Sequence, residues 1–558
     1  MKRPSTYPGR IALSAILTSI ILLLANQAIA KEYIVKLKNH PLQYSFDYLA
    51  SSTNNTYKVN GIAEDMGLIK VDAKVDENSE DAQLKLKKYF DAEYVVPNVK
   101  LHAFIDDSDP RRAEQWALDV IHAADAWNIS PGSKSVVVAV IDTGVDMTHE
   151  DLKGNIWENP GEIAGNKVDD DNNGYIDDVH GWDFFAKDKD PTDETGGQNP
   201  GHGTHCSGIV GALCGNGLGV CGISPVVSIM PLRFLDKNGS GDLFDSVKAI
   251  EYAMNNGAHI ISASWGANID RSGAQPIIDA IQKAEEKGLI FVVAASNDGK
   301  SNDTTEVYPA NAQTPNIISV AASNSNDQKP SWSNYGRKVD LAAPGENILS
   351  TVPGGYEELS GTSMATPYVA GLVALMKSLD ISLTGAQARS ILQSTGAKVD
   401  IQTASNTRID AKNALQAVAS QSLTVVPAAA TFKVNDEFDF AAWGGVGPYT
   451  FSSDNSDIAS VDEQGHLVAK ALGSVIINVS DSAGNTARSV SVEISDGSGG
   501  GGGSGDCPFG NDFMCQIMCL FDPSQSWCQG GGGGGGGLPF PIPGLPGLPG
   551  LPGMPGNI

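Results

Sequence analysis

The sequence predicts an α/β protein in three parts: a doubly wound parallel sheet, a smaller α+β unit before it and a β-sandwich after it. Three observations predict this arrangement. Near-continuous apolar runs alternate with helical patterns through the middle of the chain, strand-like and helical patterns mix before them, and short strand-like segments follow residue 421. The 558 residues are also too many for a single core, so several domains are expected.

The chain begins with an export signal, which we place at residues 1–30. Three basic residues precede the apolar run 11–24, and Ala28-Ile-Ala30 is a small-residue cleavage site. A membrane anchor is the alternative, but the run is short for a span, which needs about 20 apolar residues, and no second run follows. We therefore expect a secreted, extracellular protein with no transmembrane anchor once the signal is cleaved.

The formal net charge of −27 argues against nucleic acid as a partner, because the phosphates would repel the chain. This charge suits a secreted protein or one that binds cations. Six of the seven cysteines can pair outside the cell, which leaves one free thiol. We expect Cys206 to be that free thiol and to be structural.

Residues 31–106 form a small α+β unit. Strand-like alternation occurs at residues 33–37 and 68–72, and residues 81–90 have helical spacing. The unit ends in Glu93-Tyr-Val-Val-Pro-Asn98.

The central domain, residues 107–421, contains the parallel sheet. Its apolar runs are of the kind typical of strands covered on both faces, and they lie at residues 135–142, 227–235, 259–266 and 289–296. Helical patterns lie between and after these runs, at residues 204–213, 243–256, 275–287, 368–376, 385–393 and 410–420. Sites in such sheets form at the carboxyl ends of strands, which is where Asp142 and Asn297 fall.

The C-terminal part starts with a β-sandwich at residues 422–496. Its expected strands are short and separated by Gly, Asn and Asp, which favours antiparallel pairing, and they lie at residues 431–434, 449–451, 474–479 and 488–494. Ile458-Ala-Ser-Val-Asp-Glu-Gln-Gly465 and Gly473-Ser-Val-Ile-Ile477 resemble bacterial immunoglobulin-like domains of surface proteins. We expect a spacer that contacts the cell surface, with a carbohydrate-binding or adhesion module as the alternative.

Three biased segments follow. Residues 497–506 are a Gly/Ser linker, and residues 529–558 are a Gly-rich and Leu-Pro-Gly tail that we expect to be extended. Residues 507–528 form a cysteine-rich mini-module too small for a core of its own. Two disulfides would hold it together, with a metal knuckle as the alternative; its cysteines are Cys507, Cys515, Cys519 and Cys528.

Three motifs carry chemistry, and they occur in the order Asp, His, Ser. They are Val138-Ala-Val-Ile-Asp-Thr-Gly144, Gly201-His-Gly-Thr-His205 and Gly361-Thr-Ser-Met-Ala-Thr-Pro367. The serine precedes an apolar helical stretch, and the start of a helix offers free N–H groups and a positive dipole end. A serine hydroxyl needs a base to become a nucleophile, histidine titrates near neutral pH, and a carboxylate can orient the imidazole.

Over about residues 109–421 these motifs resemble the subtilisin-like serine proteases, or subtilases, whose order Asp, His, Ser is that of subtilisin itself. The resemblance implies a subtilisin-like fold and a serine endopeptidase that hydrolyses proteins and peptides through an acyl-enzyme. It makes Ser363 the nucleophile, His202 the general base and Asp142 the orienting carboxylate. It makes Asn297 the oxyanion donor beside the Ser363 backbone N–H.

The resemblance also implies two edges that pair with an extended peptide and a pocket for the side chain before the scissile bond. The implied substrate-binding residues are Gly239, Ser240, Gly241, Ser264, Trp265, Gly266, Ala294, Ala295, Ser296 and Tyr308. Ser296 stands where the family usually has Gly, and its Cβ narrows the pocket. No carboxylate is evident at the pocket floor, so we expect broad specificity with a preference for apolar or aromatic side chains.

By the same resemblance, residues 31–106 are a propeptide that assists folding and caps the active site as an intramolecular inhibitor. An unrelated N-terminal domain is the alternative. The enzyme would remove this propeptide itself, by a cut between residues 101 and 108. His205, in the same motif as His202, is expected to be structural.

Two structural Ca²⁺ sites are expected. The first follows from the resemblance, with side chains of Asp109, Asp151 and Asn216 and carbonyls of Leu213, Leu218 and Val220; a Cys214–Cys221 disulfide would make that loop rigid. The second follows from EF-hand-like spacing in an acidic loop, with ligands at Asp169, Asp171, Asn173, Tyr175 and Asp177. His180 replaces the terminal Glu of an EF-hand, and a solvated acidic loop is the alternative.

Two other functions compete with the protease interpretation. A surface-binding protein with an inactive protease-like domain would have no need to retain all three motifs and Asn297. An esterase of the α/β-hydrolase kind needs G-x-S-x-G and the order Ser, Asp, His. This chain has Ala365 two places after Ser363, and its serine comes last.

Overall fold

The computed structural model describes residues 30–38, 56–63, 66–74, 79–98 and 107–496. The expected export signal, Gly/Ser linker, cysteine-rich module and Leu-Pro-Gly tail lie outside these residues, as does most of the expected self-cleavage segment. The chain divides into two compact units, Met1–Ala103 and Phe104–Ile558. Within the described residues, no helix combines the length and the apolar character needed to cross a membrane.

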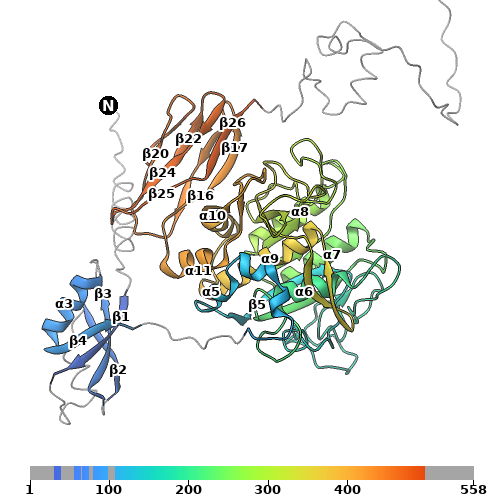
Figure 1. Ribbon diagram of the computed structural model, residues 1–558, viewed down its shortest axis with the longest axis horizontal. Helices are drawn as coiled ribbons and strands as arrows, with labels where there is room; N and C mark the ends of the chain where they lie inside the picture. The colour runs from blue at the N-terminus through green and yellow to red at the C-terminus, as the bar shows by residue number, and fades with distance from the viewer. Residues whose placement is uncertain (1–29, 39–55, 64–65, 75–78, 99–106, 497–558) are drawn as a thin grey trace, which may run out of the picture. The chain divides into compact units, whose positions relative to one another are not determined.

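The described residues of the first unit form a four-stranded antiparallel sheet and one helix (Figure 1). The strand order is β2-β3-β1-β4, and the elements are β1 (Ala30–Leu37), β2 (Tyr57–Ala63), β3 (Leu68–Lys74), α3 (Ser79–Tyr89) and β4 (Ala92–Pro97). Its core joins Val35 and Val71 of the sheet to Leu86 of the helix. The sequence predicted β1, β3 and α3 but neither β4 nor β2, and the register of β2 shifts between Val59 and Gly61.

A nine-stranded sheet with the order β14-β15-β11-β10-β9-β8-β5-β7-β6 forms the centre of the second unit. All its pairings are parallel except the β14–β15 hairpin at one edge. The strands are β5 (Gly132–Asp142), β6 (Trp182–Asp183), β7 (Val226–Arg233), β8 (Ile260–Ala263), β9 (Ile290–Ala294), β10 (Ile317–Ser323), β11 (Leu341–Pro344), β14 (Ala397–Lys398) and β15 (Thr407–Arg408).

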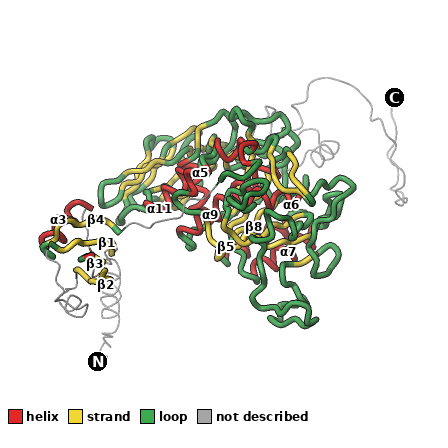
Figure 2. The backbone as a smooth tube through the Cα atoms, turned by 60° about the horizontal axis from the view of Figure 1, so that its bottom comes forward, coloured by secondary structure: helices red, strands yellow, loops and turns green. Residues whose placement is uncertain are grey.

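Helices cover both faces of this sheet, and they are α4 (Trp116–Val120), α5 (Ala123–Trp127), α6 (His202–Gly211), α7 (Leu243–Asn255), α8 (Gln275–Glu286), α9 (Thr362–Leu379), α10 (Gly385–Thr395) and α11 (Ala411–Ser420). Along β5, Val138 and Val140 pack in a core with α9, whereas Ala139 and Ile141 pack in a second core with α7 and α8. Figure 2 shows β5 and β8 with α9 to one side and α7 to the other. The predicted doubly wound α/β fold is confirmed.

The predicted C-terminal β-sandwich is present, and its strand pairings are antiparallel with one exception. Strands β17 (Ala429–Lys433) and β26 (Ser491–Ser495) pair in parallel. The remaining strands are β16 (Thr424–Val426), β18 (Glu437–Asp439), β19 (Ala441–Trp443), β20 (Thr450–Ser453), β21 (Ala459–Val461), β22 (His466–Ala469), β23 (Gly473–Val475), β24 (Ile477–Ser480) and β25 (Thr486–Arg488). The predicted strand 474–479 is two strands, β23 and β24, because the chain changes its pairing partner at Ile476. The predicted strand 488–494 is likewise divided between β25 and β26, because the partner changes after Arg488.

The sandwich is packed against the α/β domain. Val426 and Trp443 are buried in the same cluster as Leu415 and Val418 of α11. The Ala428 N–H donates a hydrogen bond to Ser390 Oγ of α10 at 3.2 Å. The two domains of this unit thus share part of one core.

Candidate active site

The three chemical motifs meet at one end of the parallel sheet. Asp142 is the last residue of β5, His202 is the first residue of α6, and Ser363 lies in the first turn of α9. Helices α6 and α9 can approach closely because Gly371 has no side chain: a Cβ there would lie 3.0 Å from Val210 O. The topology therefore brings Asp142 and Ser363, which are more than 200 positions apart in the sequence, to the same site.

Asp142 and His202 form a hydrogen-bonded pair, with 2.7 Å between Asp142 Oδ1 and His202 Nδ1. The carboxylate is 1% exposed, and the same Oδ1 accepts the Thr143 N–H at 2.7 Å. Among the described residues, Asp142 Oδ2 is buried and has no hydrogen-bond partner. The pair can hold the imidazole in one orientation and stabilise its protonated form.

The serine hydroxyl points to a different partner from the one that the motifs suggested. Ser363 Oγ donates to the Ser264 carbonyl at 3.1 Å, and Ser264 Oγ donates to the Ser363 carbonyl at 2.8 Å. Among the hydrogen bonds of the described residues, none joins Ser363 Oγ to His202, so the expected hydroxyl–imidazole contact is not formed. Catalytic hydrogen bonds are often loose without substrate and tighten when it binds.

The neighbouring titratable groups differ in their environments. Burial lowers the pKa of His202, but the charge of Asp142 and their hydrogen bond outweigh burial and raise it well above 6.5. Burial lowers the pKa of His205 to about 3, so His205 is neutral, and its Nε2 lies 2.9 Å from the Ile348 carbonyl. Burial raises the pKa of the Cys206 thiol, which is free and lies 3.4 Å from the Ser363 carbonyl.

Asn297 lies beside the start of α9. Its Oδ1 accepts hydrogen bonds from Thr362 N at 2.8 Å and from Thr362 Oγ1 at 3.0 Å, so its Nδ2 has hydrogens to donate. A Cβ on Gly361 would lie 3.4 Å from that Nδ2. Together with the backbone N–H of Ser363 in the first helical turn, the amide supplies donors for a negatively charged oxygen. The sequence analysis did not single out Thr362, which fixes the orientation of Asn297.

The two expected peptide-binding edges lie beside the site. Ser264, Trp265 and Gly266 follow the end of β8, and the Gly239-Ser-Gly241 turn follows β7. Phe234 connects the two segments, because its ring contacts Trp265 edge-on at 4.9 Å between centroids and its carbonyl lies against Gly241. No residue larger than glycine fits at position 241, where a Cβ would lie 2.4 Å from that carbonyl.

The expected pocket residues lie in two places, the segment that ends β9 and the backbone bridge between Ala267 and Tyr308. Ala294 and Ala295 are buried at the end of β9, and Tyr308 is buried where its backbone pairs with Ala267. Ser296 has a φ of +95°, a conformation that favours glycine and explains why the family usually has Gly here. Its hydroxyl donates to Asp298 Oδ2 at 3.1 Å. A carboxylate therefore lies near the pocket, which the sequence analysis did not foresee.

Comparison with known proteins agrees with this geometry. The model of the Subtilase family matches residues 133–421, about half of the chain. The chain belongs to the subtilase family. It is 38% identical to thermitase from Thermoactinomyces vulgaris over 288 residues, which cover 51% of this chain and 90% of thermitase. It is 33% identical to the thermostable alkaline protease of Halalkalibacterium halodurans over 383 residues, which cover 68% of this chain and 91% of that protein. This subtilase is therefore a subtilisin-like serine endopeptidase.

Two further similarities were found. A solved protease structure from Pseudoalteromonas arctica aligns with a TM-score of 0.48 and 29% identity, covering 57% of this chain and all of that one. Residues 433–483 match the model described as the intimin immunoglobulin-like domain.

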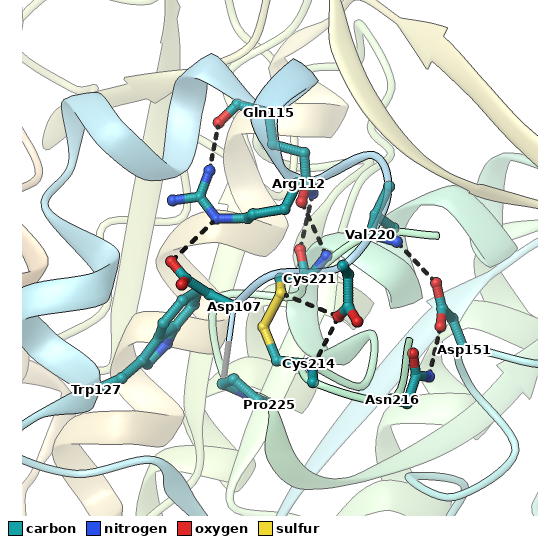
Figure 3. The surroundings of a disulfide bond; sticks show 12 residues. Asp107, Arg112, Gln115, Trp127, Asp151, Cys214, Asn216, Val220, Cys221 and Pro225 are labelled. Carbon is teal, nitrogen blue, oxygen red and sulfur yellow. Dashed lines mark hydrogen bonds and ion pairs between the residues drawn. A yellow bond between two sulfur atoms is a disulfide. The ribbon is translucent and has the colours of Figure 1, made fainter. Parts of the chain in front are cut away.

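The first expected calcium loop of this subtilase is closed by the Cys214–Cys221 disulfide (Figure 3). Asp151 is fully buried, and its carboxylate accepts hydrogen bonds from Asn216 Nδ2 at 2.7 Å and Val220 N at 2.9 Å. Asp109 accepts from the loop amides of Gly215 and Gly217. Asp151 is fully buried and forms no ion pair with another described residue, so its carboxylate suits a cation site.

The second expected calcium loop is arranged differently from the EF-hand spacing. Asp169 accepts the backbone N–H groups of Asn173 and Gly174. Asp177 is ion-paired with Lys189 at 2.8 Å and so is neutralised.

The carboxylates that come together in this loop are Glu162, Asp171 and Asp178, whose oxygens lie within 4.8 Å of one another. Burial raises the pKa of Asp178, as expected for an acid held among other acids. Glu162 and Asp178 were missed because the sequence spacing follows a linear loop, whereas Glu162 is brought in from before it.

Proposed function

We propose that Ser363 attacks the scissile carbonyl while His202 takes its proton and Asp142 stabilises the resulting imidazolium. The hydrogen bond between Asp142 and His202 is the observation that carries this proposal. The attack forms a tetrahedral intermediate, and His202 then gives the proton to the leaving amine as the C–N bond breaks, which leaves the acyl-enzyme. Water, deprotonated by His202, hydrolyses this ester and frees Ser363. Asn297 Nδ2 and the Ser363 N–H would hold the oxyanion.

Casein hydrolysis by purified enzyme tests this assignment, after the propeptide of every protein, wild type included, has been cut off by a separate protease and removed. The Ser363→Ala and His202→Ala variants should lose nearly all turnover, while both remain folded and unfold in a single cooperative thermal transition. Retained activity in a folded Ser363→Ala variant would remove the serine from this role.

The peptide-binding edges and the pocket support a broad endopeptidase that prefers apolar or aromatic side chains before the scissile bond. The residues that frame the pocket segment, Ala294, Ala295 and Val307, are apolar and buried, and Asp298 is engaged by Ser296. Matched peptide substrates that differ only at this position test the preference through kcat/KM. A strong preference for Arg defeats it.

The chain as a whole would be an exported precursor of a secreted enzyme. Its proposed parts are a signal at 1–30, an inhibitory propeptide at 31–106, the catalytic domain at 107–421, an immunoglobulin-like sandwich at 422–496, a linker at 497–506, a cysteine-rich module at 507–528 and a tail at 529–558. The Ser363→Ala protein should keep its propeptide, whereas the active enzyme should release it. Cleavage at the junction in that variant would refute self-processing.

Two structural calcium ions would complete the fold. Asp109, Asp151 and Asn216 would hold the first with carbonyls of the disulfide-closed loop, and a buried carboxylate without a paired cation supports this fit. Asp171, with Glu162 and Asp178, would hold the second. A hard cation with oxygen ligands would neutralise both acidic groups. The match of the sandwich to the intimin domain supports a contact with the cell surface through this region.

A further inference from the structure

We propose that Asp193 is a positioning residue of the catalytic pair. Its carboxylate fastens the segment after Asp142 to the first turn of α6 and so fixes how Asp142 and His202 face each other. The inference rests on the roles proposed above for these two residues. Asp193 belongs to none of the three motifs and comes from the loop that precedes α6.

The Asp193 carboxylate is 6% exposed and accepts four hydrogen bonds. Thr143 Oγ1 and Asn199 Nδ2 donate to its Oδ1 at 3.0 and 2.8 Å. Thr204 donates to its Oδ2 twice, from N at 3.0 Å and from Oγ1 at 2.7 Å. Asp193 is therefore bound to the residue after Asp142 and to two residues that flank His202.

Four donor groups from three residues point at the carboxylate and favour its ionised form, whereas burial raises the pKa of Asp193. Thr143 Oγ1 also accepts the Gly203 N–H at 2.9 Å, so its one proton is directed to Asp193. Thr204 Oγ1 likewise accepts the Asp146 N–H at 3.0 Å. An amide in place of the carboxylate would direct an NH₂ group at a donor, so even an isosteric substitution breaks the network.

Two routes lead from Asp193 to the reacting groups. Through Thr143 it reaches the N–H that donates to Asp142 Oδ1. Through Asn199 it reaches the His202 backbone N–H, which donates to Asn199 Oδ1 at 2.7 Å. The first turn of α6 packs tightly against the segment 142–144, because a Cβ on Gly203 would lie 3.1 Å from the Asp142 Cβ and 2.1 Å from the Gly144 carbonyl.

The experiment compares Asp193→Asn and Asp193→Ala with wild type in the mature enzyme. We expect kcat to fall about 10- to 100-fold with KM changed less than about twofold, because a misplacement of about 1 Å in the pair costs about that much. Thr143→Val, which removes one donor, provides a milder second variant if the first two fold poorly. Active-site titration with a serine-directed phosphonate corrects kcat for the folded fraction.

Asp481→Asn is the matched control. Asp481 is a 7% exposed carboxylate in the sandwich, and it also accepts four hydrogen bonds, from Val446 N, Ala483 N, Asn485 N and Asn485 Nδ2. This variant should lose thermal stability but keep the wild-type kcat. If Asp193→Asn behaves in the same way, Asp193 is only structural and the proposal is overturned.

A double-mutant cycle with Asp142→Asn supplies the second readout. If Asp193 acts through the pair, its substitution should add little to the loss already caused by Asp142→Asn. In the Asp142→Asn background it should also move the acid limb of the kcat/KM profile only slightly. Multiplying losses would show independent action and contradict the proposal. Wild type and Ser363→Ala are assayed beside these variants. An active wild type and an inactive Ser363→Ala variant show that the proposed function holds, whatever the outcome for Asp193.

Discussion

At the scale of single residues, two opposing influences set the pKa of His202. Burial lowers it, and the charge and hydrogen bond of Asp142, together with a smaller contribution from Cys206, raise it to well above 6.5. Because the folded pKa lies above the ordinary 6.5, the His202–Asp142 ion pair stabilises the fold fully below pH 6.5. That contribution is lost as pH rises through the folded pKa, which is also where the neutral base needed for catalysis appears.

The acid limb of kcat/KM should therefore have its midpoint above pH 6.5. In Asp142→Asn the midpoint should move down, because the charge that favours the imidazolium is gone. The pH profile of both proteins on one peptide substrate measures this shift. A wild-type midpoint at or below 6.5 would contradict the assigned pair.

Asn297→Ala should reduce kcat while KM changes little, since the lost hydrogen bond forms only when the oxyanion develops. The expected loss is about 10²- to 10³-fold, the magnitude measured for the corresponding loss in subtilisin itself. Asn268→Ala is a suitable control, because Asn268 contacts Asp298 and not the start of α9. A loss confined to KM would mean that Asn297 only binds substrate.

The residues of the candidate site could be predicted where a short sequence motif contains them. Asp142, His202, Ser363 and Asn297 lie in such motifs, and the structure brings them to one end of the sheet. Asp193, Glu162 and Asp178 were not predictable, because their roles depend on contacts that only the folded chain creates. The Ser363–Ser264 hydrogen bond belongs to the same class.

At the scale of elements, the loop 214–221 is held from three sides. The disulfide closes it, Asp151 binds its amides, and Gln115 makes two hydrogen bonds of 2.8 Å with the backbone of Cys221 (Figure 3). A calcium ion that binds only the folded loop would add to these constraints by mass action.

Chelation should therefore shorten the half-life of the enzyme during heating. At a free Ca²⁺ concentration of 100 times Kd, one such site stabilises by about 2.7 kcal/mol, which corresponds to a shift of several degrees. Asp151→Asn and Asp171→Asn assign the effect to the first or the second loop. Equal half-lives with and without chelator would remove both sites.

Helices and parallel strands were predictable because their patterns are local. Strands β8 and β9 and helices α7 and α8 lie close to their expected positions. Strands β10 and β11 were not predicted, nor was the hairpin of β12 (Ile348–Val352) and β13 (Gly355–Leu359). The parallel β17–β26 pair joins the two ends of the sandwich, so no local pattern reveals it.

At the scale of the whole molecule, the sandwich is part of the catalytic unit. Val426 and Trp443 complete a core on α11, while Arg337 and Glu493 form a surface ion pair at 2.7 Å. Burial of one such side chain contributes about 1.5–3 kcal/mol, whereas an exposed ion pair contributes about 1 kcal/mol or less. The apolar contacts therefore dominate this interface.

A chain that ends at residue 421 should unfold about 5 °C or more below one that ends at residue 496, with kcat unchanged after correction for active enzyme. Arg337→Gln in the longer chain should shift the midpoint by no more than about 2 °C. Scanning calorimetry on the three proteins gives the comparison. Equal midpoints for the two lengths would show that the sandwich is only tethered.

The most direct test of the central claim is covalent labelling of the mature enzyme by a serine-directed phosphonate, followed by peptide mapping. We predict one adduct, on Ser363, whose formation parallels the loss of peptidase activity and is slowed strongly in His202→Ala. Complete inactivation without an adduct on Ser363, or labelling of Ser363 that leaves activity intact, would contradict the account.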